Sequence, residues 1–84
     1  MKKIKFDRKI DVESDEFKEF IKSLENETKI KIVFEMGEEI TMTDLQEEFE
    51  KLKNVLPDTI DVEFYNIVDE RLDKDAMIMT LEVK

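Results

Sequence analysis

The sequence contains no cysteine, histidine or tryptophan, and it has one glycine and one proline among 84 residues. Without cysteine, neither a disulfide framework nor thiolate chemistry is available. Without histidine, the commonest catalytic base and metal ligand is missing, and one glycine cannot build a glycine-rich phosphate-binding loop. No apolar run approaches the ~20 residues that a membrane-spanning helix needs, and no signal-peptide pattern opens the chain. We therefore expect a cytoplasmic protein that is not an enzyme and holds no cofactor or metal ion.

Charged residues make up 44% of the chain and are mostly acidic, with 23 Asp and Glu against 14 Lys and Arg. The formal net charge is −9, and residues 1–9 alone carry +4, which leaves −13 for residues 10–84. A surface this acidic repels the phosphates of nucleic acids and of anionic membranes, so we expect neither as a direct partner. The hydrophobic share of 40% can still supply a core, and we expect residues 1–84 to form a single domain.

The first third of the chain changes from a period of two to a helical period. Apolar and charged residues alternate between positions 4 and 12, which predicts a strand. Arg8 interrupts this alternation and marks a bulge or the end of regular pairing. Ser14 is a suitable N-cap, and apolar residues follow it at helical spacing, so we predict a helix from about 15 to 25.

A second strand is predicted over residues 30–36, where apolar and charged side chains again alternate. Gly37 follows directly and can reverse the chain, because a residue without a Cβ accepts a positive φ. Ile40 and Met42 continue the alternation, so this stretch is compatible with a hairpin onto a short third strand. The pattern also predicts four methionines in the core, namely Met36, Met42, Met77 and Met79.

A second helix is predicted over residues 44–55. Thr43 and Gln46 have the spacing of a capping box at its start, and Pro57 follows its expected end. The apolar residues at helical spacing, which should face the core, are Leu45, Phe49, Leu52 and Leu56.

Two further strands are predicted over residues 60–68 and 77–83, with a polar connection between them. Two amphipathic helices would then cover one face of a four- or five-stranded sheet, which is an α+β fold. With the short third strand counted, the element order resembles a ferredoxin-like plait with one strand added at the end. Without that strand, the order is β-α-β-α-β-β, and both orders agree with the pattern.

Few residues are candidates for chemistry. Ser14 and Ser23 have no histidine to activate them, so a helix cap and a helix-surface position explain them better than catalysis. Carboxylates crowd the connection between the last two strands and could offer oxygen ligands to a cation such as Ca²⁺. These residues are Asp69, Glu70, Asp73 and Asp75. Their spacing does not match an EF-hand loop, so a solvated loop is favoured over a metal site.

Four apolar residues are predicted on the sheet face opposite the helices, where a sheet with one covered face should be polar. They are Val33, Tyr65, Ile67 and Ile78. Charged residues at neighbouring positions would surround them, and an apolar centre with a charged rim is typical of a protein interface. A bulge near Asn66 would instead turn Tyr65 and Ile67 inward.

Both predicted helices also carry many carboxylates on their outer faces. On the second helix these residues are Asp44, Glu47, Glu48 and Glu50. Such a face commonly serves solubility, but it also fits docking to a basic protein, including one that normally binds nucleic acid. Regularly spaced carboxylates can then stand in for phosphates.

The sequence therefore favours a non-enzymatic, acidic protein-interaction module with a basic partner. Its sharpest form is a phage or mobile-element inhibitor that occupies a nucleic-acid-binding surface, and the frequent Lys, Ile and Glu residues suit an AT-rich gene. The alternative is a self-associating structural module, which would form a homodimer through the open sheet face. A designed scaffold without biological function would share the features of that alternative.

Overall fold

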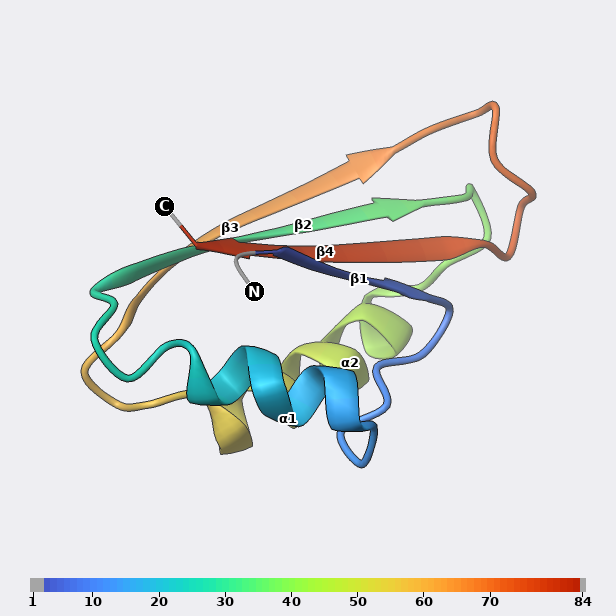
Figure 1. Cartoon of the computed structure of the whole chain (residues 1–84). Helices are drawn as coiled ribbons and strands as arrows, with labels where there is room; N and C mark the ends of the chain where they lie inside the picture. Colours follow the sequence, from blue (N-terminus) through green and yellow to red (C-terminus); the bar gives the residue numbers. More distant parts are fainter. Residues whose placement is uncertain (1–2, 84) are drawn as a thin grey trace.

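The computed structural model describes residues 3–83, in which four strands and two helices are present (Figure 1). In chain order these are β1 (Lys3–Asp7), α1 (Asp15–Lys22), β2 (Lys29–Met36), α2 (Met42–Val55), β3 (Asp61–Val68) and β4 (Met77–Val83). The α+β class is thus confirmed, with the element order β-α-β-α-β-β. Residues 37–41 connect β2 to α2 without forming a strand, so the ferredoxin-like plait with an added strand is not confirmed.

The strands form one sheet in the order β1-β4-β2-β3. β4 is antiparallel to both of its neighbours, whereas β2 and β3 pair in parallel. The parallel register runs without interruption from Lys29 opposite Asp61 to Met36 opposite Val68, which excludes the bulge considered at Asn66. β1 and β3 are therefore the edge strands, and β3 presents the same face along its whole length.

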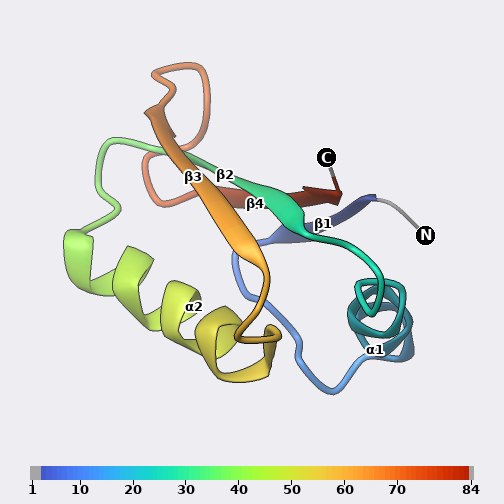
Figure 2. The same ribbon diagram turned by 90° about the vertical axis from the view of Figure 1, so that its left-hand side faces the viewer.

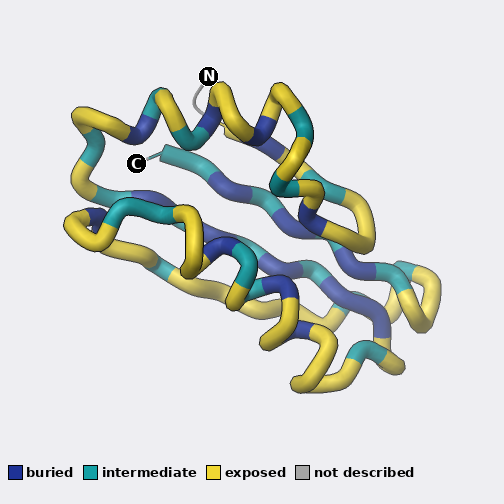
Figure 3. Tube along the Cα trace, turned by 90° about the horizontal axis from the view of Figure 1, so that it is seen from below, coloured by how far each residue is buried: buried dark blue, intermediate teal, exposed yellow. Residues whose placement is uncertain are grey.

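Both helices lie against one face of the sheet, α1 on the β1 side and α2 on the β3 side (Figure 2). Buried positions recur along the strands and along both helices, as the Cα trace seen from the helix side shows (Figure 3). The largest fully buried residues are Phe17, Phe20, Phe34, Ile10, Leu24, Ile30, Ile32, Leu52, Met79 and Leu81. The alternation of β2 and β4 thus predicted their core-facing residues correctly.

The methionines follow the predicted pattern with one exception. Met36, Met77 and Met79 are buried, whereas Met42 is 72% exposed. Met42 is the first residue of α2 rather than part of a strand, because the helix begins two residues earlier than predicted. Thr41 and Asp44 form the capping box there, with hydrogen bonds of 3.1 Å in both directions between side chain and backbone N–H.

The first helix is shorter than predicted at its C-terminal end. Ser14 caps its start as predicted, since its Oγ accepts a hydrogen bond from the Phe17 N–H at 3.2 Å. The helix ends at Lys22, and the Ser23 hydroxyl donates to the Phe20 carbonyl oxygen at 2.6 Å.

The ends of β1 and β2 are set by single residues. Arg8 has a φ of 72° and ends β1, so regular pairing stops at the residue that interrupts the alternation. Its guanidinium lies 2.9 Å from the Asp75 carboxylate in the β3–β4 connection. Gly37 does not close a hairpin but packs against that same connection, where a Cβ would overlap the carbonyl oxygens of Asp73 and Lys74.

Candidate protein-interaction surface

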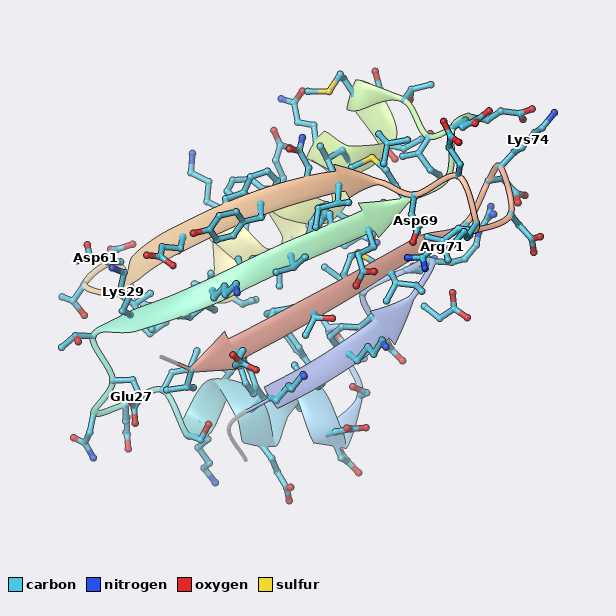
Figure 4. All side chains as sticks on the ribbon, turned by 90° about the horizontal axis from the view of Figure 1, so that it is seen from above. Glu27, Lys29, Asp61, Asp69, Arg71 and Lys74 are labelled. Atoms are coloured by element: carbon cyan, nitrogen blue, oxygen red, sulfur yellow. The ribbon has the colours of Figure 1, made fainter. Side chains whose placement is uncertain are left out.

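The sheet face opposite the helices carries the four apolar residues predicted there (Figure 4 looks onto this face). Tyr65 and Ile67 on β3 are 46% and 49% exposed, whereas Val33 and Ile78 on the inner strands are half-buried. Val33 lies opposite Tyr65 in the register, but Glu35 lies between Ile67 and Ile78. The apolar patch is therefore present and is divided by one carboxylate.

The rest of this face carries a row of alternating charges. The row crosses all four strands through Glu63, Lys31, Glu82 and Lys3, which occupy neighbouring register positions. Lys29 Nζ lies 3.1 Å from Glu63 Oε1, and Lys3 Nζ lies 3.7 Å from Glu82 Oε2. Because opposite charges alternate across the strands, this row stabilises the sheet and carries little net charge of its own.

β3 exposes more apolar surface than the other strands. Among residues 3–83, five of the seven exposed large hydrophobic side chains belong to it, namely Val62, Phe64, Tyr65, Ile67 and Val68. Val62, Phe64 and Val68 point to the helix side, where the sequence predicted core positions. They stay exposed because β3 has a neighbour on one side only. The alternation of side chains specifies a face but not the position of a strand in the sheet, so the sequence carried no signal for this exposure.

An apolar groove of about 340 Å³ opens on the helix side of β3. Its lining consists of Met42, Leu45, Gln46, Phe49 and Phe64. The rings of Phe49 and Phe64 meet edge to face, with their centroids 5.1 Å apart. α2 runs obliquely beneath the sheet, and its N-terminal half projects past the outer edge of β3 (Figures 2 and 4). The groove therefore opens along the free edge of the strand.

The carboxylates predicted on the outer face of α2 do not form one surface. Glu48 is 7% exposed, and its carboxylate accepts hydrogen bonds from the Ile10 N–H at 2.7 Å and from Lys51 Nζ at 2.9 Å. Its assignment to an outward-facing row is therefore wrong. The spacing of Glu48 from Leu45 and Leu52, three and four residues away, places it beside the buried face, and this signal was present in the sequence. Asp44 belongs to the capping box, while Glu47 and Glu50 are exposed.

The acidic connection between β3 and β4 is organised by an arginine. Arg71 donates from its backbone N–H and from Nε to Asp69 Oδ1 at 2.9 and 3.1 Å, and from a terminal nitrogen to Oδ2 at 3.1 Å. These hydrogen bonds hold the pKa of the Asp69 carboxyl below its ordinary value and raise the pKa of the Arg71 guanidinium. Residues 3–83 contain no group of three or more acidic side chains placed to hold a metal ion.

Comparison with known protein families and with curated proteins found no match to this sequence. Neither helix within residues 3–83 combines the length and the apolar character needed to cross a membrane. Among residues 3–83, most of the exposed large apolar side chains lie on β3, and exposed apolar surface of this kind is typical of an interaction site.

Proposed function

We propose that this chain is a non-enzymatic protein-interaction module that binds a basic protein partner through the β3 side. By this we mean the surface formed by the exposed apolar side chains of β3, namely Val62, Phe64, Tyr65, Ile67 and Val68. The observation that carries the proposal is the gathering of exposed apolar side chains on this one strand. Large exposed apolar patches mark interaction sites more often than they occur without a role. Tyr65 offers an aromatic ring with a polar end, the kind of side chain that dominates binding energies at interfaces.

The charge of the molecule supports a basic partner. The chain carries −9 overall, and β3 itself contains Asp61 and Glu63 and no lysine or arginine. Complementary charge speeds association and disfavours acidic partners. An inhibitor of a nucleic-acid-binding protein is the narrower form of this proposal.

The test compares two variants with the same net charge. Ile67→Lys places a cation on the exposed face of β3, opposite Glu35, where it can form an ion pair and keep the fold. Asn26→Lys adds the same charge at an exposed position in the connection that follows α1, the helix on the β1 side of the sheet. Proteins captured from an extract of the source cells are identified, and binding of each purified candidate is then measured.

We expect Ile67→Lys to weaken binding of the basic partner by about tenfold or more, while Asn26→Lys binds like the unmodified chain. The association rate should also fall between low and physiological salt, because the charges of both partners are then screened. Equal binding by the two variants, or an association rate that does not depend on salt, would contradict the proposal.

A further inference from the structure

β3 has a free backbone edge. The Asp61 N–H donates to the Thr28 carbonyl oxygen at 2.8 Å, and the Asp69 N–H donates to the Met36 carbonyl oxygen at 2.9 Å. Alternate residues of a parallel strand direct their backbone groups to the same neighbour, so the odd-numbered residues of β3 face β2. The outward-facing N–H and C=O groups belong to Val62, Phe64, Asn66 and Val68. No strand within residues 3–83 pairs with this edge.

The two edges of the sheet differ in how they are protected. β1 has five residues and carries Lys3 and Lys5, and short strands with lysine are a common defence against pairing with another chain. β3 has eight residues, includes neither lysine nor proline, and keeps its register throughout. An edge of this length without such a defence is suited to accept another strand.

We infer that β3 binds its partner by strand addition, in which an extended segment that alternates apolar and basic side chains pairs with this edge. The inference rests on the proposed function and names the kind of segment that the β3 side takes. Because side chains of a strand alternate between the two faces, each face of β3 sets the chemistry of one half of the segment.

On the helix side, the added strand lies over the apolar groove between β3 and α2. Met42 is 72% exposed and Phe64 is 38% exposed there, and Gln46 supplies the one polar side chain of the lining. The half of α2 that projects past the outer edge of β3 (Figure 4) would lie beneath the added strand. Side chains that point into this space are valine, isoleucine, leucine or phenylalanine, because a charge there loses its water without gaining a partner.

On the open face, the other side chains of the added strand lie beside Asp61, Glu63 and Tyr65. Lys31 Nζ already lies 5.4 Å from the centre of the Tyr65 ring on the β2 side, which shows that this ring accepts a cation. The carboxylates of Asp61 and Glu63 and the net charge of −9 favour lysine or arginine at these positions.

A second copy of the chain is a poorer occupant of the same edge. Its own β3 carries Asp61 and Glu63 and no lysine or arginine, so a second copy supplies no cation from its β3 to these carboxylates. Each copy also carries a net charge of −9. Like charges at an interface disfavour association, whereas a basic segment meets the opposite charge of Asp61 and Glu63 at the start of β3.

The test uses the whole chain and a synthetic peptide with free side chains and blocked ends, Lys-Phe-Lys-Val-Lys-Val-Lys-Val. Two further peptides carry backbone N-methyl groups. One is methylated on its first and second valines, and the other is methylated on its second and third lysines. An extended peptide presents the N–H groups of alternate residues to one edge, so each methylated peptide has lost the donors of one edge only.

We expect the unmethylated peptide to bind and exactly one methylated peptide to bind at least about tenfold more weakly. If the peptide with methylated valines binds more weakly, the added strand is antiparallel to β3. If the peptide with methylated lysines binds more weakly, the added strand is parallel to β3. Failure of the unmethylated peptide to bind, or an equal effect of both methylated peptides, overturns strand addition.

Two variants of the chain test the same edge from the other side. Asn66→Pro removes an outward-facing N–H without removing a hydrogen bond between β2 and β3, and Asn66→Ala keeps that N–H. We expect Asn66→Pro to weaken peptide binding by about tenfold and Asn66→Ala to bind like the unmodified chain. If Asn66→Pro does not fold, Val68→Lys replaces it, because Val68 is 62% exposed on the same edge.

The groove is tested by Met42→Asp against Thr43→Asp, which add the same charge to adjacent exposed residues in the first turn of α2. We expect only Met42→Asp to weaken peptide binding, because only Met42 lines the groove. Equal binding by both variants contradicts the role of the groove.

These outcomes separate the two proposals. A partner whose binding depends on Ile67 but is unaffected by Asn66→Pro leaves the proposed function in place and overturns strand addition. Self-association of the chain that is lost in Asn66→Pro, measured by sedimentation, identifies a second copy as the occupant and overturns the basic segment.

Discussion

The carboxylate of Glu48 on α2 accepts a hydrogen bond from the backbone N–H of Ile10 at 2.7 Å, which fastens the connection between β1 and α1 to the second helix. Lys51 Nζ lies 3.1 and 2.9 Å from the two oxygens of the same carboxylate and supplies the opposite charge. Both oxygens of this buried acid are therefore satisfied, which is the condition under which a carboxylate stabilises an interior.

Removal of this carboxylate should destabilise the fold. Glu48→Ala leaves the Ile10 N–H without its acceptor, and we expect the free energy of unfolding to fall by about 2 kcal/mol. Glu47→Ala, one residue away and exposed, should change it by no more than about 0.5 kcal/mol. Urea denaturation of the two variants measures the difference, and equal losses would show that the Glu48 hydrogen bond has no special role.

Gly37 is expected to tolerate no side chain. In Gly37→Ala, the new methyl group meets the carbonyl oxygens of Asp73 and Lys74, so the end of β2 and the β3–β4 connection must move apart. Overpacking of this kind costs about 1–3 kcal/mol. Thermal unfolding compared with the exposed neighbour variant Glu38→Ala tests this, and an increase in stability for Gly37→Ala would contradict the close packing.

Two phenylalanines on the helices should differ in their contribution. Phe20 on α1 is fully buried, so Phe20→Ala is expected to cost about 3–5 kcal/mol. Phe49 on α2 is half-buried and contacts the exposed ring of Phe64, so Phe49→Ala should cost about 2 kcal/mol. Denaturant unfolding of both variants gives the comparison, and a larger loss for Phe49→Ala would place the centre of the core beneath β3 instead.

The turn formed by Asp69 and Arg71 should make stability depend on acid pH. The hydrogen bonds from Arg71 lower the pKa of Asp69 in the folded state, below its ordinary value of 3.8. A lowered folded pKa contributes stability above the unfolded pKa, and this contribution is lost as the pH falls through the folded pKa.

Asp69→Asn should therefore be less stable than the unmodified chain near neutral pH, and the difference should shrink in acid as the pH falls through the lowered folded pKa of Asp69. Unfolding midpoints measured across this range test the prediction. Arg71→Gln should show the same dependence, since it removes the other partner. A difference that stays constant with pH would mean that the hydrogen bonds do not favour the ionised carboxylate.

Local patterns predicted most of the secondary structure, because capping and alternation depend on residues close in the chain. Ser14 capped the first helix and Arg8 ended the first strand, as the pattern indicated. The start of α2 was misplaced because two threonines, Thr41 and Thr43, offered similar caps. Thr41 forms the cap because Asp44, three residues later, completes its capping box.

The sequence by itself determined which face of each strand each side chain occupies, since successive residues of a strand point to opposite faces. For Tyr65 and Ile67 this alternation predicts the open face, and only the uninterrupted register of β3 against β2 excluded a bulge that would have turned them inward. Only the tertiary structure decided that β4 lies between β1 and β2 and leaves β3 at the edge. Strand order depends on contacts between distant segments, and the burial of Glu48 does too, because its partner Ile10 lies 38 residues away. The exposed apolar edge of β3 follows from that order, since the same strand inside the sheet would have had both of its edges paired.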